Sequence, residues 1–277
     1  MRMAAFSVLL PVYRGDHPAF LDRSIRSVTT DQHLRPNEVV VVRDGPVTPA
    51  IEAVLQIWEE SSPVPVVVVR LADNVGLGVA LTAGLDACSH DVVARQDADD
   101  VSLPERFARL VPLIESGVDL AGSGLMEFDT TESHVVGRRT PPTGADEIAD
   151  YARFHDPFNH PTVAFRRSVV GAVGGYEDLP LLEDYWLFVR MIMSGASVTN
   201  IADPLVLYRV GAGSYARRGG VALLRSEVEL QRRMHATGFT SRSQYLRNVV
   251  MRGGYRLVPE GARRLAYQGL LGHWSAP

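Results

Sequence analysis

Short β-branched runs alternate with segments of helical periodicity over residues 1–122, and this alternation limits the possible folds more than any other sequence feature. The expected strands are 6–10, 38–42, 64–70, 91–94 and 118–121. The expected helices are 17–30, 48–60, 76–87 and 103–116. Strands that are apolar at nearly every position are typical of parallel sheets covered by helices on both faces. Because crossovers between parallel strands are right-handed, the sequence predicts a doubly wound, mostly parallel sheet in a three-layer α/β/α sandwich.

The pattern becomes less regular after about residue 122. Expected elements are extended pieces in 122–139, a helix at 146–153, a strand at 162–166 with a short helix after it, a buried helix at 181–194, and strands at 197–201 and 205–210. From Arg217 the pattern is helical and basic, and no internal repeat is visible. We therefore expect one elaborated α/β domain at 1–216 with a helical C-terminal extension at 217–277.

The residue types present exclude several classes of protein. A single cysteine, Cys88, excludes an internal disulfide framework and a cysteine-based zinc cluster. All 28 basic residues are arginine, so no phosphate-binding loop of the Gly-Lys-Ser/Thr type is present. No apolar run approaches the roughly 20 residues that span a bilayer, and the N-terminus lacks a signal-peptide layout. These features predict a cytoplasmic protein.

Polar or tight-turn residues follow four consecutive expected strands. They are Pro11–Tyr13, Arg43–Gly45, Asp73–Gly76 and Gln96–Asp100. In a doubly wound sheet, ligands bind beyond the carboxyl ends of the strands. We therefore expect an enzyme site at this edge of the sheet.

Three carboxylates, Asp97, Asp99 and Asp100, come directly after a buried strand. Their mutual repulsion favours a bound cation, and hard divalent ions such as Mg²⁺ or Mn²⁺ take oxygen ligands. For Asp100 or Ser102 a helix cap near residue 103 is an alternative.

At three further candidate positions, the neighbouring residues allow two interpretations, one structural and one functional. Asp44 is either an Asx-turn residue or a carboxylate for a nucleobase or ribose. Glu183 and Asp184 either complement a helix N-terminus or belong to a site.

In their order, these segments resemble the family-2 inverting glycosyltransferases of the GT-A fold, above all those of bacterial capsular and exopolysaccharide pathways. The matching segments are VLLPVY (8–13), EVVVVRDGP (38–46), NVGLG (74–78), ARQDADD (94–100), HPTV (160–163), GGY (174–176), LEDYWL (182–187), NI (200–201) and LYR (207–209). The resemblance covers about residues 6–210. It implies a nucleotide-binding half at about 1–122 and an acceptor half at about 123–216.

The resemblance also implies roles for single residues. It assigns Pro11, Tyr13 and Asp44 to nucleotide contacts, Asp97 to the ribose or the metal, and Asp99 to the metal.

Asp184 matches the general base, and Glu183 would orient the acceptor or the base. His160 matches a pocket residue near the acceptor, although a buried structural histidine beside Pro161 is an equal alternative. Gly76, in the turn after the third strand, counts among the substrate-binding residues. Many relatives place a metal-binding histidine after the Tyr-Arg pair, whereas here Val210 and Gly211 follow Arg209.

The implied reaction moves a sugar from a nucleoside diphosphate sugar, UDP-sugar being favoured, to a glycan or lipid-linked saccharide in cell-surface polysaccharide synthesis. It implies a divalent metal, Mn²⁺ or Mg²⁺. Alternatives are a non-catalytic nucleotide-sugar-binding module and a nucleotidyltransferase. The latter would need a glycine-rich basic loop after the first strand, where only Arg14 and Gly15 stand.

Charge is distributed unevenly along the chain. Residues 1–216 carry 17 basic and 29 acidic side chains, a net of −12, whereas residues 217–277 carry 11 and 3, a net of +8. Basic helices with interleaved aromatic residues suit an anionic membrane surface, which predicts peripheral contact at the inner face of the plasma membrane. Packing on the acidic domain or a dimer face explains the same charge equally well, and nucleic acid is not an expected partner.

Overall fold

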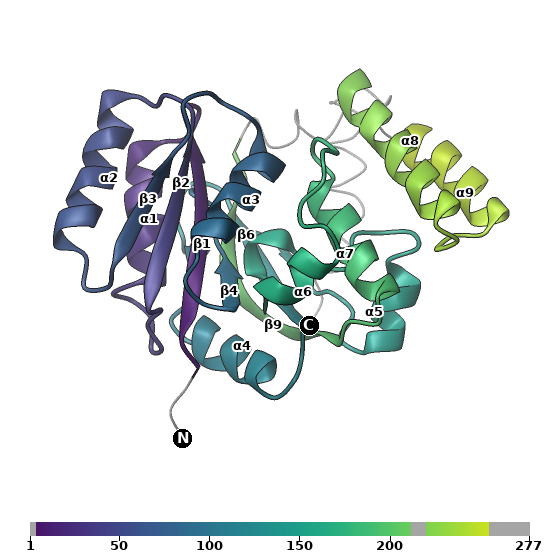
Figure 1. Cartoon of the computed structure of the whole chain (residues 1–277), viewed down its shortest axis with the longest axis horizontal. Coiled ribbons are helices and arrows are strands. Elements are labelled where there is room, and N and C mark those ends of the chain that lie inside the picture. Colours follow the sequence, from purple (N-terminus) through teal and green to yellow (C-terminus); the bar gives the residue numbers. More distant parts are fainter. Residues whose placement is uncertain (1–3, 212–219, 255–277) are drawn as a thin grey trace.

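The computed structural model describes residues 4–211 and 220–254, and its first half follows the alternation expected from the sequence (Figure 1). The strands of this half are β1 (Phe6–Tyr13), β2 (Glu38–Asp44), β3 (Val66–Arg70) and β4 (Val92–Arg95). Its helices are α1 (Pro18–Val28), α2 (Pro49–Ser61), α3 (Leu77–Ala87) and α4 (Arg106–Glu115). The strands lie in the order β3-β2-β1-β4, and each neighbouring pair is parallel. These predicted elements are confirmed, with small differences at their ends.

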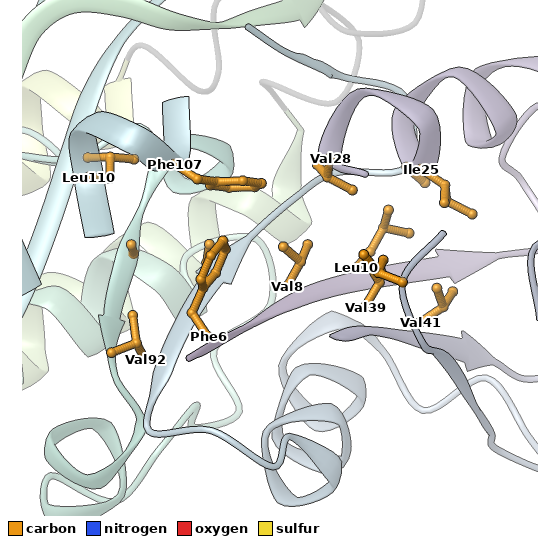
Figure 2. Packing of buried hydrophobic residues seen from close by; sticks show 14 of the residues in the cluster. Phe6, Val8, Leu10, Ile25, Val28, Val39, Val41, Val92, Phe107 and Leu110 are labelled. Atoms are coloured by element: carbon orange, nitrogen blue, oxygen red, sulfur yellow. The ribbon is translucent and has the colours of Figure 1, made fainter. Parts of the chain in front are cut away.

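Alternate residues of β1 enter two apolar cores, one on each face of the sheet. Val8 and Leu10 pack with α1, α2 and α4, whereas Leu9 packs with α3 and a later helix, α7 (Glu183–Met193). Figure 2 shows the first core, in which residues of β1, β2 and β4 face residues of α1 and α4. Fully burying one such side chain contributes about 1.5–3 kcal/mol. Burial on both faces explains why these strands contain few polar residues, and it confirms the three-layer arrangement.

The second half extends the sheet with strands of mixed direction. They are β5 (Val101–Ser102), β6 (Leu120–Phe128), β7 (Val135–Arg139), β8 (Ala164–Arg166) and β9 (Val198–Arg209). β8 lies antiparallel between β4 and β6, and β9 lies parallel to β6. β5 pairs with β9 and β7 with β6, both antiparallel. The doubly wound fold therefore continues into a second half in which antiparallel pairs join the parallel ones.

A single strand, β9 (Val198–Arg209), takes the place of the two strands expected at 197–201 and 205–210, so that expectation is wrong. The register between β9 and β6 shifts on both sides of Gly124, which lies opposite Pro204. Proline cannot donate a ladder hydrogen bond, and it interrupts the apolar pattern that would identify a single strand. Gly124 permits the shift, because a Cβ there would lie 2.6 Å from the carbonyl oxygen of Ala202.

Short helices connect the strands of the second half. They are α5 (Ala145–Tyr151), a 3₁₀ turn (His160–Thr162) and α6 (Arg167–Ala172). The buried helix expected at 181–194 is α7, which begins at Glu183. Leu181, just before it, has φ of 70° and is the one non-glycine residue with positive φ in the described chain. Such backbone conformations cost energy and are concentrated near functional sites.

The C-terminal helices pack on the second half (Figure 1). They are α8 (Val221–Ala236), α9 (Arg242–Asn248) and a π-helical turn (Val249–Gly253). Leu223, Leu230 and Met234 of α8 form an apolar cluster with Tyr185 and Trp186 of α7. None of the described helices is long and apolar enough to cross a membrane.

Polar contacts also join these helices to the domain. Arg252 forms an ion pair with Glu227, which is fully buried, and donates to the carbonyl oxygen of Phe154 at 2.6 Å. Asn248 donates to the carbonyl oxygen of Arg153 at 2.7 Å. Arg252 therefore helps to hold the C-terminal helices on the domain rather than contacting a membrane surface. The expected domain boundary at 216 and residues 255–277 lie outside the described residues.

Candidate active site

The carboxyl ends of β1 and β2 place Tyr13 beside Asp44, as expected for residues at one edge of a parallel sheet. Both side chains line a cavity of about 630 Å³, together with Asn74. Tyr13 is 46% exposed and free to contact a ligand there. Pro11 is buried within β1, so it shapes the strand and does not line this cavity.

Asp44 organises the loop that precedes α3. Its carboxylate accepts hydrogen bonds from the backbone N–H groups of Val75 at 2.7 Å and Gly76 at 3.1 Å. Gly76 has φ of 88° and is the residue that precedes α3. These bonds span about thirty residues of chain, so Asp44 does not act as a local Asx-turn residue. It shapes the wall of the cavity that it lines.

The acidic residues after β4 are brought together. Carboxylate oxygens of Asp97, Asp99 and Asp100 lie within 4.8 Å of one another. Asp100 is buried, and its Oδ1 accepts from the backbone N–H of Arg209 at 2.9 Å. Its Oδ2 is buried without a hydrogen-bond partner. Burial and the charges of Asp97 and Asp99 raise the pKa of Asp100 well above its ordinary value.

This donor set fits a hard divalent cation. All three groups offer oxygen ligands, and the unpartnered buried oxygen of Asp100 would gain an interaction from a cation. The alternative of helix caps is wrong, because α4 begins at Arg106 and no side chain caps it. Ser102 instead donates to the side chain of Gln96 at 2.8 Å.

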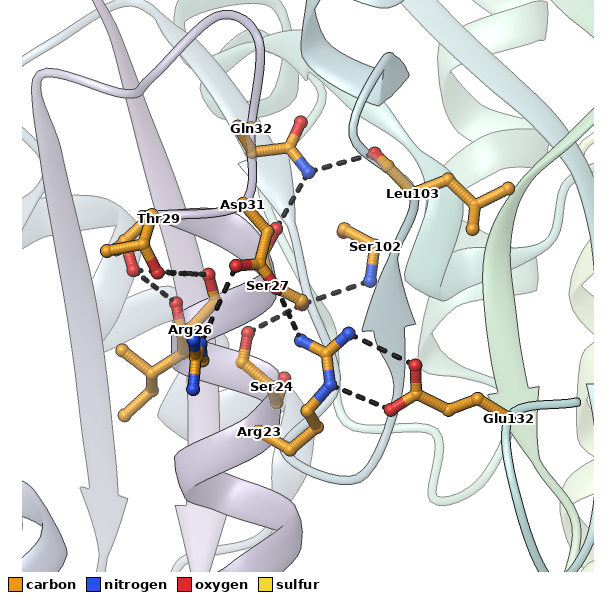
Figure 3. A network of polar contacts seen from close by, with 12 residues as sticks. Arg23, Ser24, Arg26, Ser27, Thr29, Asp31, Gln32, Ser102, Leu103 and Glu132 are labelled. Carbon is orange, nitrogen blue, oxygen red and sulfur yellow. Dashed lines mark hydrogen bonds and ion pairs between the residues drawn. The ribbon is translucent and has the colours of Figure 1, made fainter.

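A network of side chains fixes this acidic loop against α1. Ser24 donates to the carbonyl oxygen of Asp97 at 2.6 Å. Ser27 accepts from the backbone N–H of Ser102 at 3.0 Å, and Gln32 donates to the carbonyl oxygen of Leu103 at 2.9 Å (Figure 3). The backbone of the loop is therefore held from the side of α1.

Two fully buried arginines lie under the acidic loop. Arg95 forms an ion pair with Asp97, and Arg106 donates to Gln96 and Ser102, each at 2.7 Å. Burying a guanidinium is costly unless an anion compensates for it. Arg95 therefore holds Asp97 in place, a role that the sequence interpretation missed.

A second cavity, of about 650 Å³, joins this loop to the start of α7. Asp97, His160, Glu183 and Asp184 line it. The structure thus brings together residues that lie up to 87 positions apart and that the sequence interpretation had assigned to one site.

Asp184 is oriented by its own helix and by a histidine. Its Oδ1 accepts from the backbone N–H of Tyr185 at 2.7 Å, and its Oδ2 lies 3.4 Å from His160 Nδ1. His160 Nε2 lies 2.9 Å from the hydroxyl of Tyr176. Burial lowers the pKa of His160 well below its ordinary value, so the ring is neutral. A proton on Nδ1 satisfies both contacts, with Tyr176 donating to Nε2.

Glu183 and Asp184 have raised pKa values. Burial and then the charge of Asp184 raise the pKa of Glu183 to about 7. Burial also raises the pKa of Asp184, while the backbone N–H of Tyr185 opposes the shift. Perturbed carboxylates that share a cavity are typical of enzyme sites.

Asp156 is a further carboxylate in this cavity that the sequence interpretation missed. Its Oδ1 accepts from the backbone N–H of Phe158 at 3.2 Å. Burial, and next the charge of Asp184, raise its pKa well above the ordinary value. The polar residues that follow it, including Asn159 and His160, were the available signal.

Comparison with known proteins identifies the family of this chain. Residues 7–174 match the model of glycosyl transferase family 2. The amylovoran biosynthesis glycosyltransferase AmsE of Erwinia amylovora is 37% identical over 268 residues, covering 95% of this chain and 98% of that protein. The UDP-Gal:alpha-D-GlcNAc-diphosphoundecaprenol beta-1,3-galactosyltransferase of Escherichia coli is 31% identical, covering 96% of each chain.

Solved structures share the fold. The mannosyltransferase PcManGT of Pyrobaculum calidifontis, solved with GDP-Man and Mn²⁺, has a TM-score of 0.61 at 17% identity and covers 98% of this chain and 75% of that one. The fold, the family model and the two relatives agree, and the chain belongs to glycosyl transferase family 2.

Proposed function

We propose that the chain is an inverting glycosyltransferase that moves a sugar from a nucleoside diphosphate sugar to a hydroxyl group of a saccharide acceptor. The observation that carries this proposal is the cavity shared by Asp97 and Asp184. It joins a cluster suited to a metal-bound diphosphate with a carboxylate suited to a general base. The other cavity, at Tyr13 and Asp44, would take the nucleoside.

A divalent ion, Mn²⁺ or Mg²⁺, would be held by Asp99 and Asp97, with Asp100 beside them. When bound, such an ion neutralises charge on the departing nucleoside diphosphate. The neighbour PcManGT, solved with Mn²⁺, supports this assignment. Val210 and Gly211 offer no side-chain ligand, and residues 212–219 lie outside the described chain.

Asp184 would act as the general base in a single displacement. It takes the proton of the acceptor hydroxyl, whose oxygen then bonds to the anomeric carbon of the donor. The bond from that carbon to the diphosphate oxygen breaks, and the diphosphate leaves with the electron pair. Attack opposite the leaving group inverts the anomeric configuration. His160, itself held by Tyr176, would keep the Asp184 carboxylate directed into the cavity.

Uridine diphosphate is the favoured nucleotide. The support is the resemblance around Asp44 and the name of the Escherichia coli relative, which specifies UDP-Gal. The GDP-Man complex of PcManGT shows that the shared fold also accepts guanosine. Calorimetry with UDP and GDP in the presence of Mn²⁺ decides between them, and tight GDP binding without UDP binding would exclude the uridine assignment.

The acceptor would be a glycan or lipid-linked saccharide of cell-surface polysaccharide synthesis. The Escherichia coli relative is named for a diphosphoundecaprenol-linked acceptor, and AmsE for amylovoran biosynthesis. We also propose peripheral contact with the inner face of the plasma membrane through the C-terminal helices. Leu246, Val250 and Met251 are 54–70% exposed there, with Arg242 nearby on α9.

A thermal-shift panel of UDP-, GDP- and dTDP-sugars with Mn²⁺ tests the proposed function directly. A ligand at 100 times its dissociation constant adds about 2.7 kcal/mol of apparent stability. Hydrolysis of the stabilising donor then separates an enzyme from a non-catalytic binding module. A protein that binds a donor but neither hydrolyses nor transfers its sugar would support the binding module instead.

A further inference from the structure

The cavity that contains Asp184 is lined by both acidic and basic side chains. Asp97, Asp156, Glu183 and Asp184 contribute carboxylates, whereas Arg138 and Arg139, at the end of β7, contribute guanidinium groups to the same cavity. Burial raises the pKa of Asp156 well above its ordinary value, and the charges of Arg252 and Arg139 oppose only part of that shift. A ligand that fills this cavity meets both acidic and basic groups.

Arg139 is held in place within the protein. Its Nε donates to Glu127 at 2.7 Å, and its guanidinium lies 5.0 Å from the centre of the Tyr208 ring. Glu127 is 1% exposed, and Gly137 makes room for it, because a Cβ there would lie 2.8 Å from its Oε2. Glu127 therefore compensates for much of the charge of Arg139, and the pair fixes the end of β7.

Arg138 differs from Arg139 in its partners. It is exposed, and its guanidinium makes a long contact of 3.5 Å with the carbonyl oxygen of Ala202. Within residues 4–211 and 220–254, no carboxylate lies in ion-pair range of Arg138. Its guanidinium is thus available to an anion, and the planar group can donate two parallel hydrogen bonds to a phosphate.

An anionic acceptor needs such a cation. Residues 1–216 carry a net charge of −12, and four carboxylates border the cavity. A phosphate that enters would be repelled unless a cation compensates for its charge. A neutral saccharide would gain little from Arg138.

We propose that Arg138 binds a phosphate group attached to the acceptor sugar, while the sugar hydroxyl that reacts lies at Asp184. This inference rests on the proposed function and specifies its acceptor as a sugar bearing a phosphate or diphosphate ester. Arg139 supports the site by fixing the strand from which Arg138 extends.

The test compares acceptors and variants. A panel of hexoses and N-acetylhexosamines is prepared as alkyl diphosphate esters, as simple sugar phosphates and as uncharged alkyl glycosides. Transfer is measured for the wild-type protein, Arg138→Gln, Arg138→Lys and the control Arg26→Gln. Arg26 is an exposed arginine of α1 outside the cavity, so Arg26→Gln removes the same charge from a different face. Donor hydrolysis without acceptor is measured for each protein.

We expect the wild-type protein to prefer phosphate-bearing acceptors. Arg138→Gln should lower kcat/KM for these acceptors about tenfold, through an increase in KM. A tenfold loss corresponds to the low end of the energy range for a charge-assisted hydrogen bond. Hydrolysis of the donor and transfer to neutral glycosides should not change. Arg138→Lys should recover part of the loss, and Arg26→Gln should behave as the wild type. Comparing diphosphate esters with simple sugar phosphates distinguishes a lipid-type linkage from a free sugar phosphate.

Two results would overturn the inference in different ways. Equal kcat/KM for neutral and phosphate-bearing acceptors, or equal losses in Arg138→Gln and Arg26→Gln, would refute the phosphate site and leave the glycosyltransferase assignment intact. A wild-type protein that neither hydrolyses nor transfers any donor sugar would instead refute the proposed function itself.

Discussion

Replacing Asp184 by asparagine separates a catalytic role of this residue from a structural one. Asparagine has the same size and keeps an oxygen that can accept from the backbone N–H of Tyr185, the bond that Asp184 makes at 2.7 Å. Asparagine also serves well near a helix N-terminus, so α7 should form as before. What Asp184→Asn loses is the capacity to take a proton from the acceptor hydroxyl.

The expected loss follows from this geometry. A positioned general base contributes a factor of about 10² to 10⁴, which corresponds to about 2.7–5.5 kcal/mol of transition-state stabilisation. The residual contact with His160 does not compensate, because it orients the side chain without accepting the proton. Stability at neutral pH should not fall. The raised pKa of Asp184 means that its charged form destabilises the folded state, and asparagine carries no charge.

The assay measures release of the nucleoside diphosphate with acceptor present, donor affinity by calorimetry and the melting temperature. Asp178→Asn, an exposed position before α7, is the matched control and should leave all three unchanged. We expect Asp184→Asn to lower kcat by the stated factor and to keep donor affinity within a few fold. Near-normal kcat in the folded variant would refute the base assignment. A large loss of donor affinity would place Asp184 in the donor site instead.

Three further predictions follow from the site and the C-terminal helices. Asp99→Ala should abolish metal-dependent turnover and leave the melting temperature of the metal-free protein unchanged; unchanged turnover in both this variant and EDTA-treated protein would exclude the metal site. Glu183, whose pKa rises from an unfolded value of 4.5 to about 7, should make stability fall by about 3 kcal/mol as pH rises through that interval. Thermal unfolding at pH 5 and pH 8 should show that Glu183→Gln lacks this loss of stability. An identical pH response in the wild-type protein and in Glu183→Gln would contradict the prediction. Flotation with anionic vesicles should show salt-sensitive binding that Leu246→Ser and Val250→Ser weaken, and no binding at low salt would refute membrane contact.

The polarity pattern of the sequence predicted most of the first half of the fold. In β1 and β2 nearly every side chain is buried, because helices cover both faces, and this burial appears directly as an apolar run. The second half was harder to predict. β5 has two residues, and β9 contains Pro204, so neither shows the periodicity by which strands are recognised.

Residues at strand ends were predictable for a related reason. Tyr13, Asp44 and Asp97 lie at or just after the end of an identifiable strand. Parallel strands bring their carboxyl ends to one edge of the sheet, independently of the conformation of the loops. Arg95 was not identified, because a charged residue inside a strand has no local signal that a carboxylate two positions later will compensate for it.

The sequence by itself determined the layered α/β fold, the acidic cluster after β4 and the edge of the sheet at which the site lies. These depend on the order and polarity of residues that are close together in the chain. Only the tertiary structure decided that His160 contacts Asp184, that Asp156 shares their cavity and that Arg138 faces the same space. Those relations depend on distances between segments brought together by folding. The pKa values of buried groups also depend on how much water the surrounding elements exclude, and no local pattern of residues encodes that exclusion.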